Sequence, residues 1–123
     1  MVKRRKTTVP PPPSDHPLKD CMHLLAGAWT VDVIWYLREG KRCFTELKND
    51  IPGISAKMLT NRLRKLEQAA VIERCEKLTS PPTVWYVLTP VGQELCAALA
   101  GVIQIAQRLK PAQAAWHSGG RRI

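Results

Sequence analysis

The chain has 123 residues, of which 45% are hydrophobic, and its formal net charge is +9. This length suits one domain, and the hydrophobic share is ordinary for a globular protein. No apolar run approaches the ~20 residues that a membrane span needs. A proline run, rather than an apolar segment, follows the basic N-terminus, which argues against a signal peptide. We therefore expect a single-domain, cytoplasmic protein without a membrane partner.

The isoelectric point of about 9.8 favours a polyanionic partner. Much of the positive charge lies at the ends of the chain, in residues 3–6 and 121–122, whereas residues 15–110 carry a net charge of only +3. Within that body, the segment 55–68 has four basic residues against one acidic residue. The sequence therefore concentrates its internal positive charge in one short segment. The terminal basic residues are as consistent with a solubilising tail as with a nucleic-acid-binding arm.

The four cysteines stand far apart, and no C-x-x-C pair occurs among them, so we predict neither a zinc site nor another cofactor. Most such thiols are buried small hydrophobes. Cys43, which follows two basic residues, and Cys21 are kept as candidate redox sites.

Residues 1–14 contain four consecutive prolines, which cannot join a helix or a sheet interior, so we expect a disordered arm. A first helix is predicted over 17–26, capped by residue 15 or 16. A second, largely buried helix is predicted from Thr30, as its N-cap, to residue 40. A short third helix follows over 44–49, with Phe44 and Leu47 directed inward.

A proline–glycine turn at 50–54 leads to a fourth helix over 55–69, whose apolar positions are Leu59, Leu63, Leu66 and Ala70. Two strand-like runs, 71–76 and 84–88, are joined by turn-forming residues and predict a hairpin. A long last helix should begin at Thr89–Pro90 and reach residue 110, which leaves 111–123 as a flexible tail.

This order predicts a mainly α fold with a small β-hairpin wing. Two short helices around a tight turn, followed by a hairpin, are typical of a winged helix-turn-helix domain, here spanning 15–110.

Four segments carry a more specific resemblance. They are residues 27–30 (Gly-Ala-Trp-Thr), 44–47 (Phe-Thr-Glu-Leu), 51–67, which contain Pro-Gly-Ile-Ser-Ala-Lys-Met-Leu-Thr, and 86–92 (Tyr-Val-Leu-Thr-Pro-Val-Gly). With them the chain resembles the HxlR-type family of bacterial regulators over roughly residues 16–110. The resemblance implies a homodimeric winged-helix regulator that dimerises through its first and last helices.

Three positions depart from the family pattern. His16–Pro17 stands where members often carry Cys-Pro, which puts a thiol switch there in doubt. Ala28 stands where members of the family usually carry a lysine, so one phosphate contact is expected to be missing. Trp85 replaces an acidic residue of the second wing strand.

An α-helix fits the major groove of DNA, where base edges carry an unambiguous code. With its leucines directed inward, the segment 55–69 presents polar side chains outward. Asn61 is suited to adenine, Arg64 or Lys57 to guanine, and Ser55 to a phosphate at the helix start. Arg62 and Lys65 lie sideways and are expected to contact phosphate or an internal acid such as Glu46. The full predicted DNA-contacting set is Thr30, Ser55, Lys57, Thr60, Asn61, Arg62, Arg64, Lys65, Lys77 and Thr79.

The apolar stripe of the last helix is too long for one small domain to cover, which favours pairing with a second copy. The predicted dimer contacts are Leu18, Met22, Leu95, Leu99, Val102, Ala106 and Leu109.

The sequence therefore predicts a sequence-specific, DNA-binding transcription regulator that acts as a homodimer on a pseudo-palindromic operator. Two alternatives remain: a thiol-based sensor of oxidants or electrophiles with the same fold, and a winged-helix interaction module that does not bind DNA. A small-molecule effector is also compatible with the sequence. No phosphate-binding glycine loop and no paired carboxylates at a useful spacing are found, so catalysis is not expected.

Overall fold

The computed structural model describes residues 8–11 and 15–109. The predicted arm at 1–14 and tail at 111–123 lie largely or wholly outside these ranges, so the predicted domain boundaries remain predictions. In chain order the elements are α1 (Asp15–Ala26), α2 (Thr30–Tyr36), β1 (Arg42–Cys43), α3 (Phe44–Asp50), α4 (Ala56–Gln68), β2 (Ile72–Lys77), β3 (Thr83–Leu88) and α5 (Pro90–Ala106).

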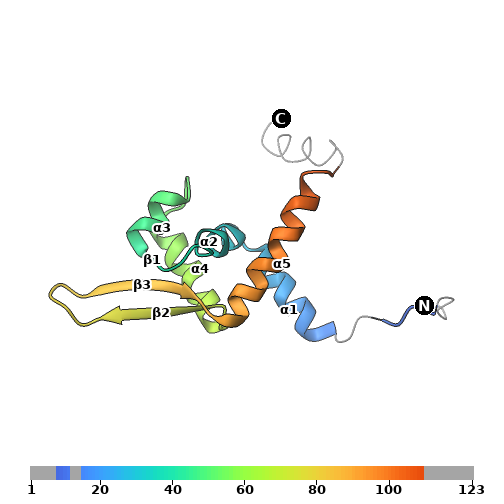
Figure 1. The fold of residues 1–123 in the computed structure, drawn as a ribbon, viewed down its shortest axis with the longest axis horizontal. Coiled ribbons are helices and arrows are strands. Elements are labelled where there is room, and N and C mark those ends of the chain that lie inside the picture. The colour runs from blue at the N-terminus through green and yellow to red at the C-terminus, as the bar shows by residue number, and fades with distance from the viewer. Residues whose placement is uncertain (1–7, 12–14, 110–123) are drawn as a thin grey trace.

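The strands form one antiparallel sheet in the order β1-β3-β2. The β2–β3 hairpin projects from the helices as a long wing, and α1 and α5 lie together on the opposite side (Figure 1). The predicted winged helix-turn-helix is therefore confirmed. The strand β1 was not predicted, because two residues are too few to show an alternating pattern.

The core lies where α2, α3, α4 and the base of the hairpin meet. The helices α2 and α4 contribute to it through apolar residues that recur at helical spacing and share one face. Its least exposed hydrophobic side chains are Val33, Ile34, Leu37, Leu47, Ile51, Leu59, Leu63, Leu66 and Ile72. No helix within the described ranges is long and apolar enough to cross a membrane.

Several predicted details are wrong. Thr30 does not cap α2: the capping residue is Trp29, in the left-handed region at φ 71°, and it makes no side-chain cap bond. The helix α2 ends at Tyr36 rather than at residue 40. Ala70 lies beyond α4 and is exposed, with a positive φ of 63°. The helix α5 ends at Ala106, short of the predicted end near residue 110.

Thr89 joins the wing to α5. Its hydroxyl oxygen caps α5 by accepting a hydrogen bond from the backbone N–H of Gly92 at 3.0 Å. The same hydroxyl lies 2.6 Å from the carbonyl oxygen of Ala70, to which it donates. Gly92 in turn packs so closely that an added Cβ would lie 2.0 Å from the carbonyl oxygen of Val71. This junction fixes the start of α5 against the segment between α4 and β2.

Candidate nucleic-acid interface

The helix α4 is held by leucines on one side and leaves its polar side open. Leu59, Leu63 and Leu66 are at most 2% exposed, since they pack against the rest of the core. Three turns of helix therefore carry a fixed inner face. On the outer face, Lys57, Asn61 and the other long side chains point away from that core.

The outer residues of α4 differ in exposure. Lys57, Asn61, Arg64 and Lys65 are exposed, whereas Thr60 is half-buried. A surface groove of about 510 Å³ runs beside the helix, lined by Ser55, Lys57, Met58, Asn61, Arg62 and Lys65. The cationic and amide side chains that line it can donate hydrogen bonds to base edges and phosphates.

Ser55 caps α4. Its Oγ accepts a hydrogen bond from the backbone N–H of Met58 at 3.0 Å, which fixes where the helix begins. The first N–H groups of a helix have no partner within the helix, and together with the helix dipole they favour an anion at this end. The turn between α3 and α4 brings this helix start to the surface, because Ile51 and Ile54 are buried and Gly53 adopts φ +84°.

Arg62 has an internal partner, but it is not Glu46. Its Nε donates to the carbonyl oxygen of Ala28 at 2.7 Å, in the turn between α1 and α2. Glu46 instead accepts a hydrogen bond from the backbone N–H of Cys43 at 2.9 Å. Sequence reasoning missed the bond between Arg62 and Ala28, because the two residues are 34 positions apart.

Thr30 is a poor candidate for a phosphate contact in this structure. Its side chain is only 2% exposed, and its hydroxyl lies against Gly27, where an added Cβ would be 3.0 Å away. A residue that is buried inside one chain presents no hydroxyl to a duplex. The predicted role of Thr30 therefore lacks structural support.

The wing places Lys77 and Thr79 near its tip, and both are exposed. Lys77 is the last residue of β2 and pairs with Thr83 of β3. The hydroxyl of Thr79 donates to the carbonyl oxygen of Pro81 at 2.7 Å within the wing loop. Lys77 is thus free to extend from the strand, whereas Thr79 uses its hydroxyl proton to shape the loop.

Trp85 occupies the centre of one face of the sheet. It pairs with Cys43 on one side and with Cys75 on the other, so the three side chains form a row. The Nζ of Lys41 lies 4.3 Å from the centre of its ring. Because adjacent strands are about 4.8 Å apart, the two cysteines are about 10 Å apart, too far for a disulfide.

The cysteines lie in different surroundings. All four are free thiols. The backbone N–H and the thiol of Cys43 lower the pKa of Glu46, so this thiol lies beside a carboxylate as well as beside Arg42. Cys21 is half-buried and lines an apolar cavity of about 360 Å³ between α1 and α5, together with Leu24 and Leu95.

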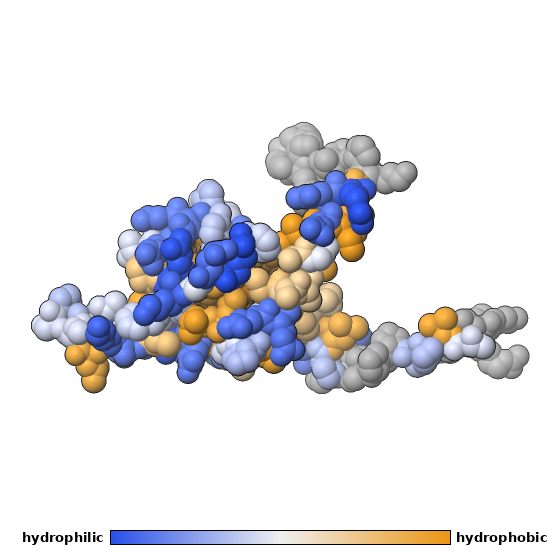
Figure 2. Space-filling view, in the orientation of Figure 1, coloured by the Kyte–Doolittle hydropathy of each residue, from blue (hydrophilic) through white to orange (hydrophobic). Residues whose placement is uncertain are grey.

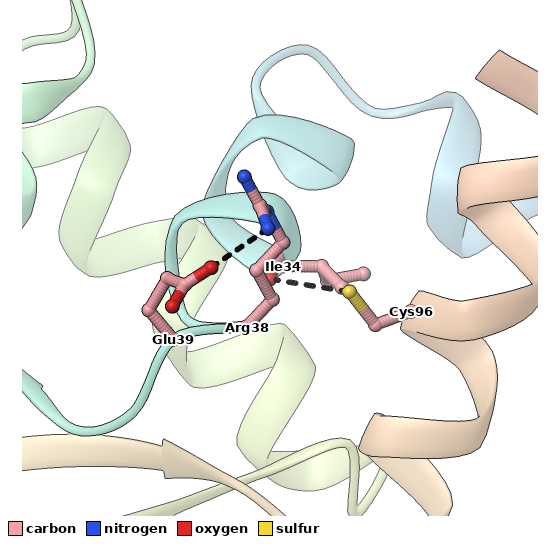
Figure 3. Close-up of polar contacts among 4 residues, drawn as sticks. All are labelled: Ile34, Arg38, Glu39 and Cys96. Atoms are coloured by element: carbon pink, nitrogen blue, oxygen red, sulfur yellow. Dashed lines mark hydrogen bonds and ion pairs between the residues drawn. The ribbon is translucent and has the colours of Figure 1, made fainter. Parts of the chain in front are cut away.

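Cys96 is a packing residue of the core. It is 7% exposed, and its thiol lies 4.0 Å from the carbonyl oxygen of Ile34 (Figure 3). Burial raises the pKa of Cys96, and the charge of Arg38 opposes this only in part. Arg38 itself pairs with Glu39 at 2.8 Å. The protonated thiol behaves as a small hydrophobe.

Only some of the predicted dimer contacts on α5 are exposed. Leu99 is 8% exposed and Leu95 is half-buried, because both pack against the chain's own core, so these two predicted dimer contacts are used largely within the chain. Further along the helix, apolar residues are open to solvent, and hydrophobic surface is visible along α5 (Figure 2). The large exposed apolar residues of α1 and α5 are Leu18, Met22, Val91, Val102 and Ile105; two further predicted contacts are exposed as well, Ala106 at the end of α5 and Leu109 just beyond it.

Comparison with known proteins assigns the family. A family model described as HxlR-like helix-turn-helix matches residues 24–114. The chain belongs to this HxlR-like family. As such, it is a helix-turn-helix transcription regulator with a winged-helix fold.

Relatives of this HxlR-like regulator are described as HTH-type transcriptional regulators. The uncharacterised HTH-type transcriptional regulator YtfH of Escherichia coli is 36% identical over 92 residues, which cover 72% of this chain and 73% of YtfH. The HTH-type transcriptional regulator YodB of Bacillus subtilis is 38% identical over 80 residues, covering 65% of this chain and 71% of YodB.

Solved structures of other regulators have a similar fold. The reduced form of YodB superposes with a TM-score of 0.72 at 32% identity, covering 78% of this chain and 94% of YodB. The oxidised form of the redox regulator HypR gives a TM-score of 0.69 at 26% identity, covering 76% of this chain and 97% of HypR.

Within the described residues of our chain, no group of three or more histidine, cysteine or acidic side chains is placed to hold a metal ion.

Proposed function

We propose that this HxlR-like regulator binds a pseudo-palindromic operator in double-stranded DNA as a homodimer. In each subunit α4 enters the major groove, and the wing contacts the backbone or the minor groove. The observation that carries the proposal is the division of α4 into a buried leucine face and an open face of cationic and amide side chains. An α-helix fits the major groove, and such side chains read base edges there.

Arg64 is the best candidate for reading a base, because it is exposed on α4 and no hydrogen bond or ion pair in the described residues engages its side chain. Arg64→Ala should weaken binding to the operator by ~1–3 kcal/mol and leave non-specific binding nearly unchanged. The operator is first selected from genomic fragments and then titrated in a gel-shift assay. Arg108→Ala, which removes an exposed arginine after α5, is the matched control and should bind as the unsubstituted protein does. An equal loss on all DNA sequences would instead mark Arg64 as a phosphate contact.

The homodimer is supported by the exposed apolar residues of α1 and α5. Val102 is 59% exposed and Met22 is 55% exposed, although both belong to helices that pack on the core. Burying such surface against a second copy is the usual reason for its exposure. Val102→Glu should dissociate the dimer in sedimentation experiments, whereas Leu78→Glu, at an apolar position on the wing that is 90% exposed, should not. A monomeric unsubstituted protein would overturn the dimer.

The remaining alternative, an interaction module without DNA binding, makes a different prediction. Phosphate contacts release counterions, so DNA binding weakens steeply with salt. A gel shift repeated across salt concentrations separates the two, because an interaction module shows no salt-dependent binding. A DNA-bound regulator acts in the cytoplasm, where we place the protein.

Thiol regulation is a second candidate function. The related structures named above include a redox regulator, HypR, and YodB in its reduced form. Cys21 is better placed than Cys43, because its cavity lies between the two helices that carry the exposed apolar residues. We expect diamide to join Cys21 to a second thiol as a disulfide, with diamide taking up the two electrons and two protons, and thereby to alter the surface beside α1 and α5. If Cys21 is the sensor, diamide should weaken DNA binding by the unsubstituted protein and leave Cys21→Ser unaffected; equal inhibition of both would exclude Cys21.

A further inference from the structure

Arg62 lies on α4, but its guanidinium group is directed toward the turn between α1 and α2. Its Nε donates to the carbonyl oxygen of Ala28 at 2.7 Å, and its Nη1 lies 3.4 Å from the Oδ1 of Asn61 on the same helix. The side chain is half-buried, unlike its neighbours Asn61 and Arg64. A charge-assisted hydrogen bond therefore joins α4 to a backbone carbonyl 34 residues earlier.

Gly27 makes this approach possible. A Cβ on this residue would lie 3.3 Å from both the Cζ and the Nη1 of Arg62 and 3.0 Å from the Oγ1 of Thr30. The guanidinium group thus rests against backbone rather than against a side chain. The buried Thr30 closes the other side of the same turn.

The turn makes a second contact with the helix-turn-helix, through Trp29. The indole Cη2 of Trp29 lies 3.5 Å from the position that a Cβ of Gly53 would take, in the turn that precedes α4. Trp29 itself adopts φ 71°, which orients the chain between α1 and α2. Residues 27–29 therefore contact α4 at Arg62 and the turn before it at Gly53.

We infer that Arg62 is a positioning residue: it fixes the reading helix α4 to the turn that follows α1 and does not contact DNA phosphate. This inference rests on the proposed function. Since α1 carries Leu18 and Met22 of the proposed dimer surface, the turn at 27–29 sets the angle between that surface and the reading helix. That angle decides how two α4 helices match the half-site spacing of an operator.

Two substitutions separate the two roles of Arg62. In Arg62→Gln the side-chain amide nitrogen takes the place of Nε, so a donor to Ala28 is kept while the charge is lost. In Arg62→Met both the donor and the charge are lost, and the side chain has nearly the same length as that of glutamine. As a positioning residue, Arg62→Gln should bind the operator within about threefold of the unsubstituted protein, whereas Arg62→Met should lose about tenfold or more.

The salt dependence of binding provides the matched control. Lys65→Met removes an exposed cation from the same helix, and as a phosphate contact it should reduce the slope of log K against log salt by about 0.9. Both substitutions at Arg62 should leave this slope unchanged. A slope reduced equally by Arg62→Gln and Arg62→Met, with equal losses of affinity, would overturn the inference.

A measurement without DNA keeps this inference separate from the proposed function. The backbone N–H of Thr30 donates to the carbonyl oxygen of Gly27 at 3.2 Å, so its hydrogen exchange reports on the order of the turn. Exchange at Thr30 should be faster in Arg62→Met than in Arg62→Gln, while exchange in β3 stays the same. Equal exchange in the two variants would refute the positioning role, even if the protein binds DNA as proposed.

Discussion

Two glycines of α5 should respond in opposite ways to the same substitution. A Cβ on Gly92 would lie 2.0 Å from the carbonyl oxygen of Val71, whereas real Cβ contacts essentially never fall below 3.0 Å. The helix and the segment before β2 must therefore separate by about 1 Å. A Cβ on Gly101, nine residues later, would meet no atom of another described element within 4 Å.

The expected cost at Gly92 follows from what that movement breaks. The carbonyl oxygen of Val71 accepts a hydrogen bond from the backbone N–H of Thr89 at 3.0 Å, and it lies 3.1 Å from the Thr89 hydroxyl, whose one proton it shares with the carbonyl oxygen of Ala70. Stretching both bonds and overpacking the junction should lower the free energy of unfolding by about 3 kcal/mol. The melting temperature should fall by roughly 10 °C or more.

Gly101→Ala should instead raise the free energy of unfolding by about 0.5–1 kcal/mol, because glycine costs conformational entropy inside a helix. Both variants are unfolded thermally and in urea at one fixed protein concentration, since a dimer gains stability with concentration. If Gly92→Ala unfolds within about 0.5 kcal/mol of the unsubstituted protein, the close contact with Val71 is not a constraint on the fold. The account of the junction between wing and α5 would then be wrong.

Two further predictions concern the core and the acid range. Leu63→Ala should lower the free energy of unfolding by about 2–5 kcal/mol, because this side chain is 2% exposed; Arg64→Ala, one position along, should change it by less than about 0.5 kcal/mol. The pKa of Glu46 is lowered by its bonds from Cys43, so its stabilising effect is complete above the ordinary value of 4.5 and is lost as the pH falls through the lowered pKa. Glu46→Gln should therefore be less stable than the unsubstituted protein at neutral pH, and urea unfolding should find no difference in strong acid. A difference that grows in acid would contradict this sign.

The order of the five helices and the hairpin, and the inner face of α4, could be predicted from the residues alone, whereas the short strand β1 could not. Leucines at 59, 63 and 66 recur at helical spacing, and the predicted starts of the fourth and last helices, at Ser55 and Thr89, agree with the structure, in which both residues are N-caps. These signals act within one or two turns of chain, so no knowledge of the fold is needed to interpret them. The hairpin was predicted for the same reason, because turn-forming residues join two strand-like runs that are neighbours in the chain.

Which residues of one stripe or one helix are buried, exposed or hydrogen-bonded could be learned only from the packed fold. Leu99 and Val102 belong to the same apolar stripe of α5, yet one packs in the core at 8% exposure and the other is 59% exposed. Arg62 and Arg64 are both arginines of α4, yet only Arg62 is bonded to the carbonyl oxygen of Ala28. Periodicity states which side of a helix a residue occupies, but not where a neighbouring element ends or which distant carbonyl lies within reach. Those distances are set when the elements pack, so they are properties of the fold.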